Sequence, residues 1–434
     1  MIKILSFFLI FFFLSNCSFD KTTGFWTEKK KIENVKNSNT KKIFASVDFK
    51  KTEYKPNLKI KLTSKPIDKS FINDFDNNNG RINYNGNLKN ISKFKFKKIR
   101  QFNEFDPELI FSNDNVIFFD NNGTIFKFDS SSNLLWKKNY YDKSEKKLNP
   151  ILFLSNKKNT LIVSDNIAKY YAININTGEL LWSKKNPAPF NSQVKVYKDK
   201  FFVVDFNNVL RCFSVIDGSQ IWKVNTENPF IKSQKKLSLV IVKDNVYFIN
   251  SIGDVTSVDI KTGNLEWQTP TQNTSIFEEG YSLKFSDITA NNKTIFFSSN
   301  KNEFHSIDLL SGIINWKQKI NSTVKPTLVD GMIFSVSMDG FLIILDSKTG
   351  NIIRITDIFN FLKKKKRSKI KPVGFILGSQ NIYLTTNKGT LLIIDILTGK
   401  TLSVLKIDNE KISRPSVLNK NLFIVKENAV IKLD

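Results

Sequence analysis

A short motif that recurs along the chain most constrains its fold. Its clearest copy starts at Gly253, has an acid six positions later at Asp259, and continues through Thr262-Gly263 to Trp267. The acidic position recurs on average about every 44 residues, within the range typical of β-propeller repeats, at Asp129, Asn174, Ser214, Asp259, Asp308, Asp346, Asp395 and Asp434. The aromatic position recurs as Trp136, Trp182, Trp222, Trp267 and Trp316, and is replaced by Arg354 and Ser403 in the next two copies. Repeats of this length, built from several short strands, predict a β-propeller.

Each position of the motif has a physical role in such a blade. An Asp side chain can accept hydrogen bonds from backbone N–H groups of a turn, and Gly adopts positive φ at little steric cost. The Trp offers a large apolar face that one repeat can pack against the next. Because the acids recur at one place in every unit, we expect them to cap turns rather than to act as catalytic carboxylates; this group comprises Asp129, Asp259, Asp308, Asp346 and Asp395.

The two ends of the repeat array predict how the ring closes. The last copy stops at its acidic residue, Asp434, so its outer strand is missing. Residues 92–99 alternate apolar and polar side chains, which is typical of a strand. We expect this N-terminal strand to complete the last blade and remove the exposed edges. The predicted fold is all-β: an eight-bladed propeller of four-stranded antiparallel blades over residues 76–434.

The N-terminus resembles a bacterial lipoprotein signal. Lys3 precedes an apolar run that ends in Leu14-Ser15-Asn16-Cys17. This resemblance implies that residues 1–16 are a signal peptide, that cleavage precedes Cys17, and that its thiol and new amino group are acylated, which gives stable membrane anchoring. Ser18 after the cysteine favours transport to the outer membrane in that class. An ordinary signal peptide with an incidental cysteine is the alternative. Residues 17–75, rich in Lys, Asn and Thr, are expected to form a lipidated tether.

Charge alone does not define a partner. Lys and Arg total 66 against 40 acidic residues, a formal net charge of +26, which suits nucleic acid or anionic lipid. No nucleic-acid-reading motif is present, so we expect no nucleic-acid partner and attribute the charge to general lysine richness. The sharpest basic cluster is residues 363–367, Lys-Lys-Lys-Lys-Arg. It is either a docking patch for anionic lipid or an acidic partner, or a solvated loop between blades.

The sequence lacks the patterns of known catalytic and metal sites. His305 is the only histidine and lies inside a repeat strand, where a structural role is the simpler interpretation. There is no His/Cys cluster for zinc, no glycine-rich phosphate loop and no nucleophile elbow. We therefore predict no catalytic residue, no metal and no cofactor.

The Asp-x-x-Thr-Gly-x-x-x-Trp repeat resembles that of the pyrroloquinoline-quinone-like propellers. With the lipoprotein signal and eight copies, the chain resembles, within that superfamily, the lipoprotein subunits of the complex that assembles β-barrels in the bacterial outer membrane. This resemblance implies a non-enzymatic scaffold on the periplasmic face of the outer membrane, docked on the periplasmic domains of the barrel-forming subunit. Two alternatives stay open: a quinone-dependent dehydrogenase, disfavoured by the lack of a vicinal cysteine pair, and a general protein-binding lipoprotein of the envelope.

In that family two neighbouring inter-blade loops carry the docking. By position they correspond here to the loops around Ile231 and Asp287. Ser233 and Gln234 stand where the family has Leu and Arg, and Thr289 replaces a second Asp. The resemblance implies that Ile231 and Asp287 bind the partner from adjacent blades. The alternative is that Asp287 caps a local turn and Ile231 fills a blade edge.

Overall fold

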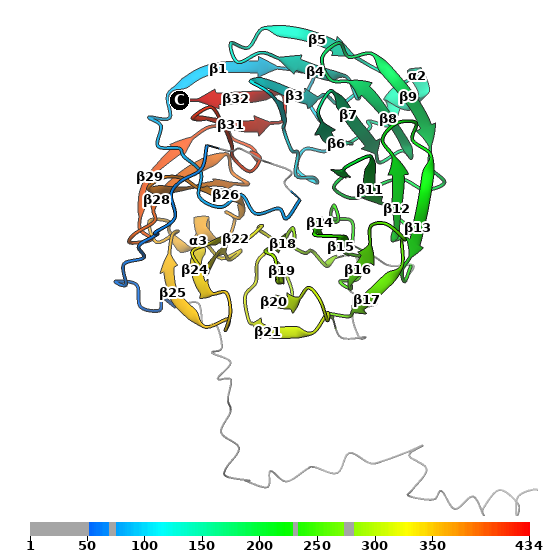
Figure 1. Ribbon diagram of the computed structural model, residues 1–434. Coiled ribbons are helices and arrows are strands. Elements are labelled where there is room, and N and C mark those ends of the chain that lie inside the picture. Colours follow the sequence, from blue (N-terminus) through cyan, green and yellow to red (C-terminus); the bar gives the residue numbers. More distant parts are fainter. Residues whose placement is uncertain (1–51, 69–74, 229–232, 273–281) are drawn as a thin grey trace, which may run out of the picture. The chain divides into compact units, whose positions relative to one another are not determined.

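Eight four-stranded antiparallel sheets surround one axis, so the predicted eight-bladed propeller is confirmed (Figure 1). The computed structural model describes residues 52–68, 75–228, 233–272 and 282–434. All of them belong to one structural unit, Val47–Asp434.

Seven blades are built from four consecutive strands that run from the axis to the rim. Blade 1 contains β2 (Ile110–Ser112), β3 (Asn115–Phe119), β4 (Ile125–Phe128) and β5 (Leu134–Lys138), and blade 2 contains β6 (Leu152–Lys157), β7 (Thr160–Asp165), β8 (Lys169–Asn174) and β9 (Leu180–Lys185). Blade 3 contains β10 (Lys195–Tyr197), β11 (Lys200–Val204), β12 (Val209–Ser214) and β13 (Gln220–Asn225), and blade 4 contains β14 (Leu239–Val242), β15 (Asn245–Ile249), β16 (Val255–Asp259) and β17 (Leu265–Thr269). Blade 5 contains β18 (Thr289–Ala290), β19 (Thr294–Ser299), β20 (Glu303–Asp308) and β21 (Ile314–Gln318). Blade 6 contains β22 (Thr327–Val329), β23 (Met332–Val336), β24 (Phe341–Asp346) and β25 (Ile352–Asp357). Blade 7 contains β26 (Pro372–Leu377), β27 (Asn381–Thr386), β28 (Thr390–Asp395) and β29 (Thr401–Lys406).

The eighth blade joins the two ends of the chain. Its inner strands are β30 (Ser416–Leu418), β31 (Asn421–Lys426) and β32 (Ala429–Leu433), and its outer strand is β1 (Asn90–Lys95). Phe94 lies opposite Val430 in the antiparallel β1–β32 ladder. The predicted closure is therefore confirmed, although the ladder covers 90–95 rather than 92–99. Within the described ranges, two helices of one turn or little more, α2 (Lys143–Lys147) and α3 (Lys364–Arg367), lie in connections between blades.

Burial falls from the middle of each blade to its rim. The second strand of a blade is buried almost throughout, as in β7, whereas the fourth strand is mostly exposed, as in β9. Apolar clusters form between blades: Phe202 and Leu210 of blade 3 pack with Val246 and Phe248 of blade 4. A single blade could not bury these residues, so the stacking of neighbours creates the core.

The motif forms a repeated joint between neighbouring blades. The indole Nε1 of each motif Trp donates to a backbone carbonyl of the next blade at 3.0–3.2 Å, from Trp136 to Ile175, Trp182 to Val215, Trp222 to Ile260, Trp267 to Leu309 and Trp316 to Ser347. The accepting residue directly follows the acidic position of the motif. The turn Gly of the next blade lies on the indole ring; a Cβ on Gly263 would approach Trp222 Cγ to 2.7 Å. The ring and the glycine are therefore complementary.

A β-bulge turns each Trp toward its neighbour. In blade 4 Ser257 lies opposite Trp267, whereas Val258 lies opposite Leu265, so Glu266 is the extra residue. The same register shift occurs beside the motif position in all seven complete blades. A bulge bends and twists its strand, which re-aims the side chain that follows.

The acidic motif residues cap the turns at these joints. Asp259 Oδ1 accepts the backbone N–H of Thr262 at 2.6 Å and its hydroxyl at 2.7 Å. Asp129, Asp308, Asp346 and Asp395 likewise accept N–H groups of the turn that follows each of them.

Part of the segment assigned to the tether lies against the propeller instead. Tyr54 and Ile355 exchange backbone hydrogen bonds of 3.1 and 2.9 Å, and the Ile60 N–H donates to Leu397 at 2.8 Å. Ile60 is 6 % exposed and joins the core of blades 6 and 7. Residues 52–68 therefore belong to the folded body. The few apolar residues that anchor them are scattered among Lys and Asn, which hides their periodicity.

Candidate functional site

One end of the propeller axis is closed by residues 75–82, which run across the middle of the ring (Figure 1). Asn77 is fully buried, and its amide donates to the carbonyls of Leu239 and Ile288 at 3.0 and 2.9 Å. The ammonium of the buried Lys195 donates to Asn77 Oδ1 at 2.6 Å. A single asparagine thus bonds to strands or connections of blades 3, 4 and 5 and seals the channel.

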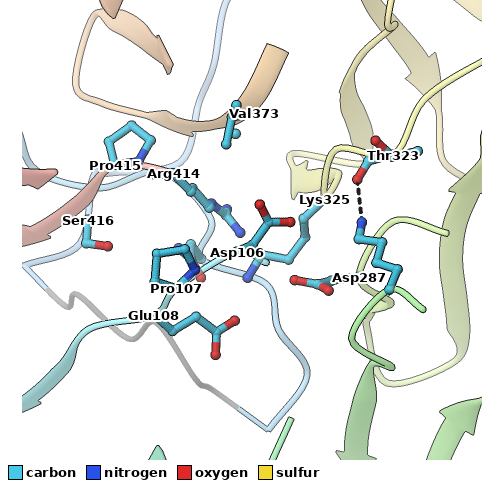
Figure 2. A pocket seen from close by; sticks show the side chains of 13 residues that line it. Asp106, Pro107, Glu108, Asp287, Thr323, Lys325, Val373, Arg414, Pro415 and Ser416 are labelled. Atoms are coloured by element: carbon cyan, nitrogen blue, oxygen red, sulfur yellow. Dashed lines mark hydrogen bonds between the residues drawn. The ribbon is translucent and has the colours of Figure 1, made fainter. Parts of the chain in front are cut away.

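Above this segment the axis holds a cavity of about 50 Å³, here called the axial pit. It is lined by the connections that lead into the inner strands, and by Asn79 of the closing segment. Three charged residues of the lining stand directly before a proline: Asp106-Pro107, Lys325-Pro326 and Arg414-Pro415. Proline favours an extended conformation of the preceding residue, which suits a chain entering a strand. In Figure 2 Asp106 lies between Arg414 and Lys325, and Asp287 points into the same space.

Ion pairs hold two of the three lining carboxylates. The ammonium of Lys411 lies 2.8 Å from Asp106 Oδ1, and that of Lys236 lies 2.9 Å from Glu108 Oε1. Desolvation opposes the ionisation of Asp106, although its side chain is 45 % exposed, but Lys411, Lys235 and Lys236 outweigh this effect and hold its pKa well below the usual range. Both carboxylates are therefore neutralised within the protein.

The cations of the axial pit are crowded. Burial, with the charges of Lys236 and Lys411, lowers the pKa of Lys235. Burial also lowers the pKa of Arg414 to about 10. Lys325 is only 6 % exposed. Among the described residues, Lys235, Lys236, Lys325, Lys411 and Arg414 face three carboxylates, which leaves a net positive charge.

Two buried polar atoms of the pit lack a partner. They are Arg414 Nη2, a donor, and Asn79 Oδ1, an acceptor. Arg414 is held in place through its Nε, which donates to the Phe375 carbonyl at 3.1 Å. An unpaired buried polar atom costs free energy, and each of these two atoms has the capacity for one more hydrogen bond.

Asp287 is the one predicted partner-binding residue that the structure describes. It is half-buried and lines the axial pit, on the connection into β18. Ile231 and Cys17 lie outside the described residues. The connections that carry Ile231 and Asp287 touch through their described parts: Lys235 Nζ donates to the Phe285 carbonyl at 2.5 Å, and the Ile288 N–H to Ser238 Oγ at 2.9 Å.

The other polar features considered from sequence have structural contacts. His305 is fully buried and stacks on Phe297 with ring centroids 5.0 Å apart. Burial lowers its pKa to about 3, which keeps the imidazole neutral. In the basic run 363–367, Arg367 pairs with Asp357 at 2.5 Å and donates to the Asp339 carbonyl. The lysines of α3 are exposed.

Sequence reasoning missed the cations of the axial pit. Lys235, Lys325 and Arg414 belong to connections of different length and do not follow the motif spacing. A charged residue followed by proline, just before an inner strand, is the signal that could have found two of them.

Metal-binding clusters and membrane-spanning helices are both absent from the described residues. No group of three or more His, Cys, Asp or Glu side chains in the ranges given above could hold a metal ion. Within the same ranges, no helix has both the length and the apolar character needed to cross a membrane.

The fold and its repeated joints define the class: a pyrroloquinoline-quinone-type repeat propeller. The sequence profile of the family described as "Outer membrane protein assembly factor BamB" matches residues 112–356, more than half of the chain. The chain therefore belongs to the BamB family.

Known proteins with this name are distant in sequence. "Outer membrane protein assembly factor BamB" of Moranella endobia (strain PCIT) is 23 % identical over 196 residues, which cover 44 % of this chain and 50 % of that protein. The chain spans about half the length of the curated relatives it matches.

Solved structures share the fold. BamB from Moraxella catarrhalis superposes with a TM-score of 0.64 at 14 % identity, covering 80 % of this chain and 100 % of the other. Quinohemoprotein alcohol dehydrogenase from Comamonas testosteroni gives 0.62 at 9 % identity, covering 83 % and 79 %. At these identities the likeness shows the fold alone.

Proposed function

We propose that this chain is a non-enzymatic scaffold lipoprotein of the outer-membrane β-barrel assembly machinery. In this proposal it docks on the periplasmic domains of the barrel-forming subunit and helps the insertion of outer-membrane proteins. Its membership of the BamB family is the observation that carries the proposal. The basic residues serve solubility and local contacts, and no nucleic acid is bound.

The docking face consists of the connections between blades 3 and 4 and between blades 4 and 5. Direct bonds join these connections, so a partner that contacts one is close to the other. Loops suit binding because the strands of each blade are committed to the core. Ile231 supplies an apolar anchor, and Asp287 an acid that pairs with a basic residue of the partner.

The double substitution Ile231→Ala with Asp287→Ala tests this face. Affinity for the purified barrel-forming subunit, measured at matched salt, should fall by about 1–3 kcal/mol, a typical hot-spot loss. Asp244→Ala is the control, because Asp244 is an exposed acid in the β14–β15 turn, at the opposite end of the blade. Unchanged affinity of the folded double variant would remove the docking face, and loss of binding with unfolding would assign both residues a structural role.

The membrane anchor is Cys17, acylated after cleavage of residues 1–16, and the protein faces the periplasm on the outer membrane. Cys17→Ala should release the protein from the membrane fraction. A substituted protein that stays firmly membrane-bound would contradict the anchor.

The dehydrogenase alternative has its own test. Pockets for small molecules usually measure roughly 300–1,000 Å³, whereas the axial pit has about 50 Å³. This difference in room supports a propeller without a quinone cofactor. Calorimetric titration with pyrroloquinoline quinone and calcium should give no binding heat.

Pull-down of the barrel-forming subunit separates the scaffold from a general envelope-binding propeller, which would not retain that subunit.

A further inference from the structure

The axial pit is blind and its open end is charged. Residues 75–82 seal it through Asn77, and Asn79 contributes to its lining. Asp106, which also lines the pit, keeps 45 % of its side chain exposed. A ligand group therefore enters from the end where the connections between blades lie.

The charge inside the pit favours an anion. Glu108 and Asp106 are already paired with Lys236 and Lys411. Among the lining residues this leaves Asp287 against Lys235, Lys325 and Arg414. Lys235 also donates to the Phe285 and Thr323 carbonyls, so its position is fixed before any ligand arrives. Desolvated cations in a confined site bind an anion more strongly than the same cations on an open surface.

The two unpartnered atoms restrict the chemistry of the ligand that could bind in the pit. Arg414 Nη2 needs an acceptor, and Asn79 Oδ1 needs a donor. A peptide that ends in a free carboxylate offers both, because the carboxylate oxygens accept and the N–H of the last residue donates. Pro107, Val373 and Pro415 give the pit apolar walls for a small last side chain. A volume of about 50 Å³ holds a few waters at roughly 10–15 Å³ each, and thus one carboxylate group.

We propose that the axial pit binds the C-terminal carboxylate of an extended peptide chain. Arg414 and Lys325 contact the carboxylate, and Asn79 accepts the last N–H. This site borders the proposed docking face at Lys235 and Asp287, but the proposal does not depend on docking of the barrel-forming subunit.

Titration of the full-length lipidated protein in detergent tests the proposal. The probes are the peptide Gly-Ser-Gly-Ser-Gly-Ala with a free C-terminus, the same peptide with a C-terminal amide, and an amide-ended version with an internal Asp. The free carboxylate should bind at least tenfold more tightly than either amide-ended peptide. Inorganic phosphate at equal ionic strength should compete only weakly.

Two substitutions with opposite expected effects on peptide affinity make the test specific. Lys325→Met should weaken binding of the free-ended peptide at least tenfold, whereas Asp287→Asn should strengthen it by removing a carboxylate. Lys348→Met is the matched control, since Lys348 is an exposed lysine in a rim turn of blade 6, and it should change nothing. If Lys325→Met fails to fold, Asp287→Asn still decides the question.

Equal affinity of the free and amide-ended peptides would overturn the proposal. Binding of the internal-Asp peptide as tightly as the free-ended one would assign the pit to acidic side chains and also overturn it. Failure here is distinguishable from failure of the scaffold proposal, because Asp287→Asn is expected to weaken docking of the barrel-forming subunit while strengthening peptide binding.

Discussion

The motif Trp residues and Arg354 all link one blade to the next, but they do so with different side chains. Trp222 donates one hydrogen bond to Ile260 in the next blade and packs its ring against a turn glycine. Arg354 stands at the Trp position between blades 6 and 7 and donates to Ile396, the residue equivalent to Ile260. The Arg joint therefore keeps the bond that defines the Trp joints.

Arg354 also makes two hydrogen bonds that a Trp at this position could not make. Its Nη1 donates to Leu397 at 2.6 Å and to Leu58 at 2.9 Å. Leu58 belongs to the N-terminal segment that lies along blades 6 and 7, so one side chain joins three parts of the chain. The cost is a buried guanidinium whose Nε has no partner, and burial lowers its pKa to about 10. The replacement of the aromatic residue thus coincides with the place where a third segment must be held.

Removing the guanidinium should have the largest effect. Arg354→Met leaves three carbonyls without their donor, and we expect a loss of about 3–5 kcal/mol in the free energy of unfolding. Urea unfolding measures it. Arg100→Met, at an exposed arginine, is the control and should change stability by less than about 0.5 kcal/mol. A loss below about 1 kcal/mol in Arg354→Met would mean that the joint is held by packing alone.

Adding a Cβ at the turn glycines should separate the two kinds of joint. Gly263 and Gly399 both have positive φ, +77° and +73°. A Cβ on Gly263 meets the rigid Trp222 ring at 2.7 Å, whereas one on Gly399 meets the ends of Arg354 and Thr356 side chains at 2.7 Å. We expect Gly263→Ala to cost about 2–4 kcal/mol and Gly399→Ala about 1–2 kcal/mol. Thermal and urea unfolding of the pair check the order, and equal costs would show that backbone strain dominates.

Restoring the motif should release the N-terminal segment. Arg354→Trp can keep the bond to Ile396 but loses those to Leu58 and Leu397, and we expect a stability loss of about 1–2 kcal/mol. Hydrogen exchange should quicken at the Tyr54 and Ile60 amides, which bond to Ile355 and Leu397. Unchanged exchange at these amides would show that Arg354 does not hold the segment.

Removing only the indole N–H should have the smallest effect. Trp222→Phe keeps an aromatic ring but loses the 3.2 Å bond to Ile260, which we expect to cost about 1 kcal/mol. Urea unfolding measures the loss, with Trp26→Phe as a control outside the repeats. A loss above about 3 kcal/mol would mean that packing of the larger ring dominates the joint.

The repeated parts were predictable because each position acts through local geometry. A turn needs a cap at Asp259 and positive φ at Gly263, whatever lies elsewhere in the chain. Periodicity then multiplied a weak signal, so the blade number and the closing strand could be predicted. The bulge before each Trp was not predicted, because the extra residues, such as Leu181 and Glu266, share no chemistry.

The candidate site was much less predictable. Asp287 was chosen through a family resemblance, and only the structure brings it beside Lys235, Lys325 and Arg414 in the axial pit. These residues lie up to 127 positions apart from it in the sequence, in connections that vary in length. No local pattern encodes that proximity, because it depends on the closure of the whole ring.

By itself the sequence determined the blade: its turn cap, its Trp joint, its buried strands and the strand borrowed from the N-terminus. Only the tertiary structure decided what occupies the axis and where residues 52–68 and 75–83 lie. The physical reason is that these residues bond mainly to backbone carbonyls and amides of distant blades, as Asn77 does to Leu239 and Ile288. Nearly every residue offers the same backbone groups, so the sequence does not indicate which residue is the hydrogen-bond partner.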